Sequence, residues 1–141
     1  MIDYHELRVW VKAHQLTLAI YKASLTFPKE ELYRLTSQIR RAAISIPANL
    51  AEGCGRDSQP ELLRYIRIAI GSASELDYEL LLAHELNWLK EPVYQEISAE
   101  LASLRRMLNS FSRKLISNLQ KPSSNIQSPT SKIENNEVTN V

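Results

Sequence analysis

Apolar side chains recur at steps of three and four residues along most of the first 120 positions, which predicts amphipathic helices rather than strands. Four such segments follow one another. The third has its inward positions at Leu62, Ile66, Ala69, Ala73, Leu76, Leu80 and Ala83, and the fourth at Tyr94, Ile97, Leu101, Leu104, Leu108, Phe111 and Leu115. Alternating steps of this kind are typical of helices that cross at shallow angles. Because the connections are short, the pattern predicts an all-α, antiparallel up-down four-helix bundle over residues 1–120.

The ends of the first two helices are marked by local signals. Asp3 and Glu6 have the spacing of a capping box, so the first helix is expected to start there and to run to about Leu25. Proline and acidic residues at 28–31 indicate a start for the second helix, but a start near Thr36 after a separate short turn fits the sequence as well.

The later boundaries are clearer. The second helix is expected to end within residues 53–55, which contain two glycines. Ser58 and Glu61 form a capping box for the third helix, and Pro92 starts the fourth. Residues 121–141 are rich in Ser, Asn and Thr and lack apolar periodicity, which predicts a disordered polar tail.

Pro47 lies inside the apolar pattern of the second helix. That pattern continues past it, at Leu32, Leu35, Ile39, Ala43, Ile46 and Leu50. A proline within a helix removes a backbone hydrogen bond and clashes with the carbonyl four residues earlier, at a cost of about 3 kcal/mol. We therefore expect close packing around Pro47 to offset this cost, and a role in shaping the helix rather than in chemistry.

The first two helices are apolar on more than one face. In the first, one stripe contains Leu7, Trp10, His14, Leu18, Tyr21 and Leu25, and another contains Val9, Ala13, Leu16, Ile20 and Ala23. A single chain needs one buried stripe per helix, so the additional faces predict a contact between subunits. The positions assigned to this interface, or to a structural role, are Val9, Leu16, Ile20, Tyr33, Arg40, Ile44, Pro47 and Asn49. His14 is expected to be a core or interface histidine.

Composition excludes several classes of protein. Apolar residues make up 44% and charged residues 23%, which is ordinary for a globular protein, and the net charge is only +1. The chain has neither a signal peptide pattern nor an apolar run of the ~18 residues that a membrane span needs. A cytoplasmic protein without a membrane partner is therefore expected. Cys54 is the single cysteine, so no disulfide framework is predicted.

No motif for catalysis is found. Helical bundles often hold metals through Glu-x-x-His, but the residues three before His5, His14 and His84 are Ile2, Val11 and Leu81. The sequence also lacks a glycine-rich phosphate loop and a nucleophile elbow. We therefore expect a protein that is not an enzyme and that uses neither a metal nor a cofactor.

Unevenly distributed charge is the main functional signal. The second helix and the start of the third hold Arg34, Arg40, Arg41, Arg56, Arg64 and Arg67, and the fourth helix is purely basic after Glu100. Guanidinium groups are good ligands for phosphate. The candidate nucleic-acid contacts are Arg34, Arg41, Arg56, Arg64, Arg105, Arg106, Arg113 and Lys114. Pairing within the chain or between subunits is the alternative. We expect no aromatic residue to interleave with these arginines, so no base-stacking platform is predicted.

Several segments together resemble a known family. Leu35-Thr36-Ser37-Gln38-Ile39-Arg40-Arg41-Ala42-Ala43 and Ser45-Ile46-Pro47-Ala48-Asn49-Leu50-Ala51-Glu52-Gly53 are similar to the four-helix-bundle family of 23S rRNA intervening-sequence proteins, as are Phe27 to Glu31 and Ile68 to Ser72. Two features depart from the family pattern: Cys54 stands where an aromatic residue is usual, and the net charge is nearly neutral.

The resemblance implies a four-helix bundle that assembles as a ring-like homopentamer with a role near RNA. A related branch, the accessory variability proteins of diversity-generating retroelements, binds reverse transcriptase and nucleic acid. The resemblance therefore favours an RNA-associated binding module. The alternatives are an adaptor for a reverse transcriptase or another protein, and a purely structural oligomer.

Overall fold

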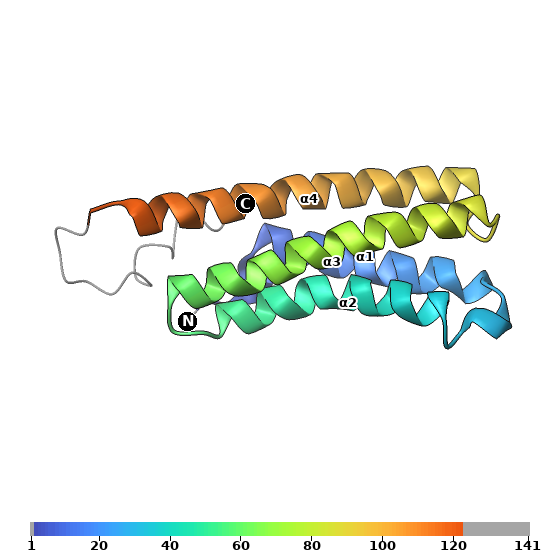
Figure 1. Cartoon of the computed structure of the whole chain (residues 1–141), viewed down its shortest axis with the longest axis horizontal. Helices are drawn as coiled ribbons and strands as arrows, with labels where there is room; N and C mark the ends of the chain where they lie inside the picture. The colour runs from blue at the N-terminus through green and yellow to red at the C-terminus, as the bar shows by residue number, and fades with distance from the viewer. Residues whose placement is uncertain (1, 123–141) are drawn as a thin grey trace.

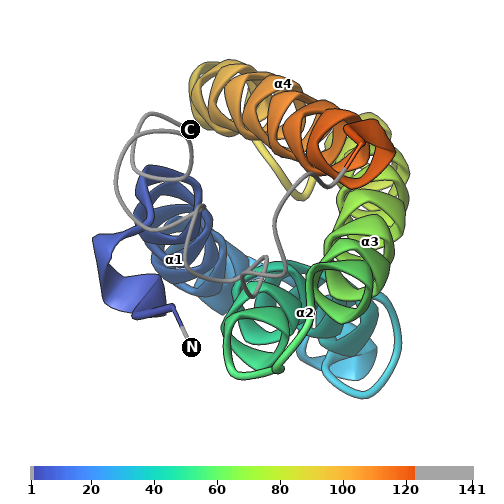
Figure 2. The same cartoon turned by 90° about the vertical axis from the view of Figure 1, so that its left-hand side faces the viewer.

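The computed structural model describes residues 2–122, so most of the predicted tail, from position 123 onward, lies outside them. This part of the chain forms four α-helices and no strand: α1 (Arg8–Ala23), α2 (Leu35–Cys54), α3 (Gln59–Glu85) and α4 (Glu91–Gln120). Three short 3-10 helices are η1 (Tyr4–Glu6), η2 (Ser24–Thr26) and η3 (Lys29–Glu31). The helices lie side by side, with α2 and α4 at opposite corners (Figures 1 and 2). The all-α prediction is confirmed.

The first helix is shorter than predicted. The Asp3 carboxylate accepts a hydrogen bond from the backbone N–H of His5, so it caps the short helix η1 rather than a long helix. Leu7 then adopts an extended backbone with a ψ of 121° and is buried, and α1 begins only at Arg8. Its last residue is Ala23, because the chain tightens into the 3-10 turn η2.

The start of the second helix is now fixed. Residues 29–31 form the separate helix η3, and α2 begins at Leu35, which decides between the two starts that the sequence allowed. The predicted cap of the third helix is confirmed, since the Glu61 N–H lies 3.3 Å from the Ser58 hydroxyl. The last turn of α3 closes through Asn87, whose φ of 65° is left-handed.

The helices share one apolar core. All seven predicted inward positions of α3 are buried, and so are those of α4 except Tyr94, which is half-buried. In α2 the pattern from Leu35 to Leu50 is buried, whereas Leu32 lies before the helix and is 43% exposed. Each of these helices presents one stripe to the core, as the periodicity predicts.

In α1 the stripe whose residues were assigned to the interface or to a structural role faces the core of the chain. Val9, Leu16 and Ile20, predicted as interface or structural positions, are buried in the core of their own chain. Of the other stripe, Leu7 is buried and Trp10 is half-buried against the core, and the remaining members lie on the outer side; we call Trp10, His14, Leu18, Tyr21 and Leu25 the outer stripe. Two of its members are strongly exposed, Leu18 at 58% and Leu25 at 76%.

A polar group beside each stripe is consistent with the stripe that faces the core. Thr17 lies beside the buried stripe, and its hydroxyl is within hydrogen-bond distance of two buried carbonyl oxygens. The outer stripe contains the imidazole of His14, which is exposed and stacks on Trp10 with ring centres 5.0 Å apart. Of the two expected places for His14, the core is therefore excluded, and the interface stays a prediction.

The other predicted interface or structural positions lie on or near α2. Pro47 is buried, and α2 continues through it without a break. Tyr33 is 90% exposed and Ile44 is 43% exposed. Asn49 donates to the Ser45 carbonyl at 2.7 Å.

Candidate nucleic-acid interface

Two of the predicted arginines meet around one aromatic ring at the connection between α2 and α3. Arg56 Nη2 lies 2.7 Å from Tyr65 Oη and 2.7 Å from Glu52 Oε1. The guanidinium carbons of Arg56 and Arg64 lie 5.2 Å and 4.5 Å from the centre of the Tyr65 ring. The expectation of no aromatic side chain among the arginines is therefore wrong, because the turn after Cys54 brings these residues together.

This cluster carries little net charge. The hydrogen bond to Tyr65 raises the pKa of Arg56, and the hydrogen bond to Glu61 raises the pKa of Arg64, so both groups stay charged. Each cation has a carboxylate beside it, since Arg64 Nη2 lies 3.2 Å from Glu61 Oε2. The arrangement mainly ties the turn together, and the pairing weakens its attraction for phosphate.

Two further arginines make contacts between helices. Arg105 of α4 donates to the Ser74 hydroxyl at 3.2 Å and lies 3.5 Å from the Asp77 carboxylate, both on α3. Arg40 donates from Nε to the Ser24 hydroxyl at 2.9 Å and lies over the ring of Tyr21 at 4.9 Å. These contacts match the alternative of structural pairing for Arg105, and they agree with the structural assignment of Arg40.

Four predicted contact residues are exposed, and their side chains make no ion pair or hydrogen bond within residues 2–122, namely Arg34, Arg41, Arg106 and Arg113. Lys114, the remaining candidate, is half-buried. The first pair belongs to the start of α2 and the second to α4, which lie at opposite corners (Figure 2). The structure therefore does not bring the predicted residues into one patch.

The larger basic surface lies on the outward sides of α3 and α4. We call it the α3–α4 basic surface (Arg64, Arg67, Arg106 and Arg113), and all four residues are exposed. The first half of α3 lies beside the last half of α4 (Figure 1). Residues 101–120 contain no Asp or Glu, and residues 59–74 contain only Glu61. A polyanion approaching these outward sides therefore meets few negative charges that would repel it.

Other kinds of site find little support in the described residues. No three His, Cys, Asp or Glu side chains between positions 2 and 122 are placed to hold a metal ion. Burial raises the pKa of the Cys54 thiol to about 12, with a smaller contribution from the charge of Asp3, so the thiol stays protonated. In the same part of the chain, no helix combines the length and the apolar character needed to cross a membrane.

Comparison with known proteins decides the family. The profile of the 23S rRNA-intervening sequence protein family matches residues 5–110, which covers all of α1, α2 and α3 and most of α4. The chain belongs to this family. The sequence resemblance to the intervening-sequence proteins is thereby confirmed.

One solved structure shares the fold of this intervening-sequence protein. It is the crystal structure, at 1.70 Å resolution, of a protein with unknown function from the S23 ribosomal protein family of Bacteroides thetaiotaomicron. The two proteins superpose with a TM-score of 0.69 at 22% sequence identity, over 74% of this chain and 95% of the other. No curated protein sequence matches the chain.

Sequence reasoning missed the part that Tyr65 plays beside Arg56. The two residues are nine positions apart and on different sides of a turn, so only the geometry of the connection makes them partners. The adjacency of Arg64 and Tyr65 was the available signal. The separation of the α2 and α4 arginines also escaped sequence reasoning, because it depends on which helices lie at opposite corners.

Proposed function

We propose that this intervening-sequence protein is a non-enzymatic, RNA-associated binding module that contacts the phosphate backbone through the α3–α4 basic surface. The observation that carries the proposal is the set of exposed arginines on adjacent helices where residues 101–120 contain no carboxylate. One guanidinium group can donate two parallel hydrogen bonds to the oxygens of a phosphate, and it keeps its charge at every physiological pH. Arg106 and Arg113 have no carboxylate partner among the described residues, so RNA would not have to displace one from either group.

Salt dependence tests the RNA proposal. Binding that neutralises phosphates releases counterions, so the affinity falls steeply as the salt concentration rises. We expect purified protein to shift structured fragments of large-subunit rRNA at low salt and to release them at higher salt. The absence of any shift at low salt would remove the proposal.

We also propose that the chain is an antiparallel up-down bundle that assembles in the cytoplasm as a ring-like homopentamer. The outer stripe supports self-association, because Leu18 and Leu25 present apolar side chains that the chain itself leaves largely exposed. Tyr33 and Ile44 add exposed apolar surface on and near α2. Light scattering of the purified protein checks this proposal, and a monodisperse monomer at micromolar concentration would contradict it.

A structural oligomer without RNA is the competing function, and the outer stripe favours it. RNA binding and oligomeric state, measured for the wild type and for an arginine variant, distinguish the two functions. If Arg106 and Arg113 serve RNA, their replacement by glutamine weakens RNA binding and leaves the oligomer unchanged. If assembly alone is the function, RNA binding is absent in the wild type as well.

A further inference from the structure

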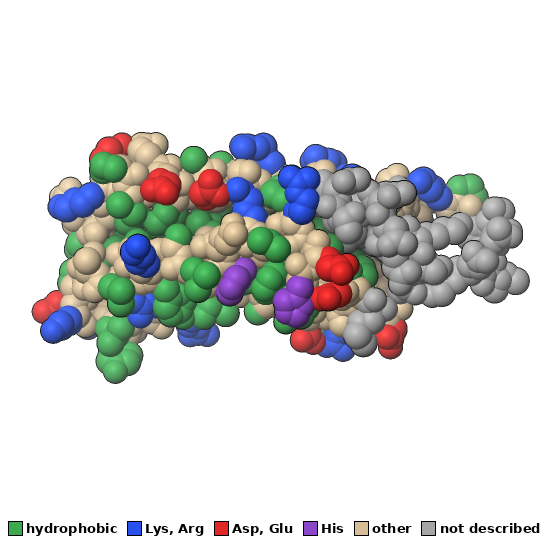
Figure 3. Space-filling model, turned by 180° about the vertical axis from the view of Figure 1, so that it is seen from behind, with side chains coloured by type: hydrophobic (Ala, Val, Ile, Leu, Met, Phe, Trp, Pro, Cys, Tyr) green, Lys and Arg blue, Asp and Glu red, His purple; other side chains and the backbone are tan. Residues whose placement is uncertain are grey.

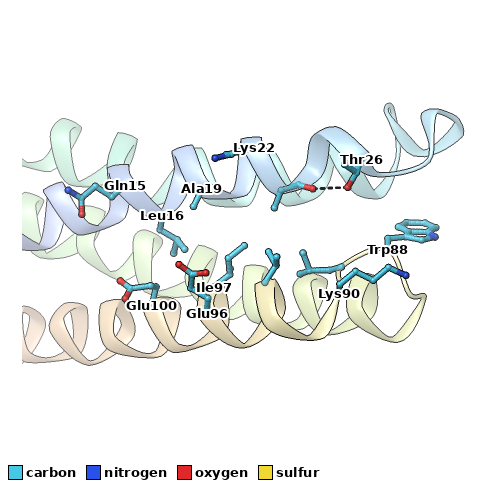
Figure 4. A pocket seen from close by; sticks show the side chains of 13 residues that line it. Gln15, Leu16, Ala19, Lys22, Thr26, Trp88, Lys90, Glu96, Ile97 and Glu100 are labelled. Atoms are coloured by element: carbon cyan, nitrogen blue, oxygen red, sulfur yellow. Dashed lines mark hydrogen bonds between the residues drawn. The ribbon is translucent and has the colours of Figure 1, made fainter.

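A groove lies between α1 and α4, next to the connection from α3 to α4, and has a cavity volume of about 740 Å³. Its floor is apolar, since Leu16 and Ile97 approach each other from the two helices (Figure 4) and each is only 4% exposed. Trp88 lies at one end of the groove. Near the other end, Lys12 Nζ lies 2.6 Å from Glu100 Oε2 and joins the two helices.

Small side chains on α1 leave this groove open. Ala19 and Ala23 line it on the α1 side. Val93 lies one helical turn before the buried Ile97, yet it is 40% exposed, because these alanines do not reach across to cover it. The lining on this side runs from Gln15 to Ala23 in α1, which corresponds to about 12 Å of helix, and continues to Thr26 in η2.

The α4 rim of the groove is acidic. Glu96 and Glu100 both line it, and α4 contains no Lys or Arg from Glu91 to Leu104. Lys90 lies at the Trp88 end, and Lys22 lines the opposite, α1 side. Glu96 makes no ion pair or hydrogen bond with another described residue. Figure 3 shows hydrophobic side chains in the hollow between the two helices and acidic side chains on its upper side. An apolar floor with an acidic rim suits a basic amphipathic helix.

The chain itself carries such a helix. From Arg8 to Ala23, α1 contains no Asp or Glu, and its cations are Arg8, Lys12 and Lys22. Its outer stripe is uncovered, with Leu18 at 58% exposure. The outer stripe and the groove lie on different sides of α1, so that one copy offers both surfaces at once.

We propose that the outer stripe of one copy docks in the α1–α4 groove of the next copy, which rests on the proposed self-assembly. Two different surfaces meet in this contact, so it is heterologous and repeats around a ring or along a filament. Lys22 lies between the outer stripe and the groove of its own copy, and from there it approaches Glu96 of the next copy. The α3–α4 basic surface shares α4 with the groove but none of the residues that line it, and it stays open to RNA.

Complementary variants test this contact. Leu18→Glu places a charge in the outer stripe, Val93→Glu places one in the groove, and both positions are exposed enough for the chain to fold. Each variant alone is expected to be a monomer of 16.1 kDa by light scattering. An equimolar mixture is expected to form a one-to-one dimer, because each partner supplies the surface that the other has lost. Tyr78→Glu, at a side chain on α3 that is 62% exposed, is the control and should remain an oligomer.

Other outcomes overturn the inference. If Val93→Glu stays an oligomer while Leu18→Glu becomes a monomer, the groove is not the acceptor. If the two monomeric variants fail to combine on mixing, the contact is not heterologous. A wild-type monomer would instead remove the proposed self-assembly together with this contact, while leaving the RNA proposal untouched. Thermal unfolding by circular dichroism checks that each variant is folded.

Discussion

The hydroxyl of Thr17 on α1 lies 3.1 Å from the carbonyl oxygen of Ala43 on α2. Ala43 is the residue four positions before Pro47, so its carbonyl is the one that the proline deprives of a helical N–H donor. The same hydroxyl lies 2.8 Å from the carbonyl oxygen of Ala13. The single hydroxyl proton is shared between the two carbonyls, so a side chain from the neighbouring helix offers Ala43 a donor in place of the N–H that Pro47 lacks.

Thr17→Val should destabilise the protein by about 1–3 kcal/mol, the cost of leaving a buried carbonyl without a donor. Valine keeps the shape of threonine, so the loss is that of the hydrogen bond. The midpoint of urea unfolding measures it. The control is Thr26→Val, at an exposed hydroxyl that donates only to Ala23 on its own turn, where a change within about 0.5 kcal/mol is expected.

A double-mutant cycle ties this cost to the proline. Pro47→Ala restores an N–H that can donate to the Ala43 carbonyl, so Thr17→Val should cost less in that background than in the wild type. Strictly additive free energies of unfolding would show that the Thr17 hydroxyl does not compensate for Pro47.

A buried carboxyl group should make stability depend on pH. Glu79 on α3 is 4% exposed, and its Oε1 has no hydrogen-bond partner among the described residues. Burial raises its pKa from 4.5 to about 7, and the nearby Glu75 carboxylate adds to the shift. The folded state therefore holds this proton more tightly than the unfolded state. Between about pH 4.5 and pH 7, stability should fall as the pH rises, by up to about 1.4 kcal/mol per pH unit from this group.

Glu79→Gln removes this titration and isolates it from all others. The variant should be more stable than the wild type at pH 8, where the wild-type carboxylate is charged, and the difference should shrink toward pH 4.5. Urea unfolding at the two pH values measures the effect, and Glu85→Gln is the control at an exposed position of the same helix. A stability difference that is the same at both pH values would contradict the assignment.

Two glycines should respond in opposite directions to alanine. A Cβ at Gly53 would lie 2.9 Å from Tyr65 Cβ and 3.0 Å from Leu62 Cδ1, so Gly53→Ala forces α2 and α3 apart and should cost about 1–3 kcal/mol. A Cβ at Gly71 would meet nothing within 4 Å, and Gly71→Ala should stabilise α3 by about 0.5–1 kcal/mol. Thermal unfolding distinguishes them, and equal effects would show that the α2–α3 contact at Gly53 is not tight.

The periodicity of the sequence predicts most of this fold, for a physical reason. In α3 and α4 the apolar residues form one stripe, so the positions from Leu62 to Leu115 that should be buried can be read directly. In α1 two stripes compete, and periodicity alone does not choose between them. The choice also involves another helix, because the Ala43 carbonyl of α2 lacks a helical donor and the Thr17 hydroxyl lies 3.1 Å from it.

The candidate site is less predictable than the fold. Charge along the chain identifies which residues are cations, but their partners depend on packing. Arg105 reaches Asp77 on another helix, and Arg56 reaches Tyr65 across a turn. The α1–α4 groove depends on which α4 side chains lie opposite Ala19. The pattern of residues within a single helix cannot predict this pairing.

RNA binding by paired variants tests the central claim most directly. Arg106→Gln with Arg113→Gln removes two cations from the α3–α4 basic surface, and Arg34→Gln with Arg41→Gln removes two exposed cations from the other corner. Affinity for a structured rRNA fragment is measured as a function of salt. The first pair should weaken binding and reduce the slope of log K against log salt by about 1.4–1.8, whereas the second should change both little. Equal effects of the two pairs, or a wild type that binds no RNA at low salt, would contradict the account.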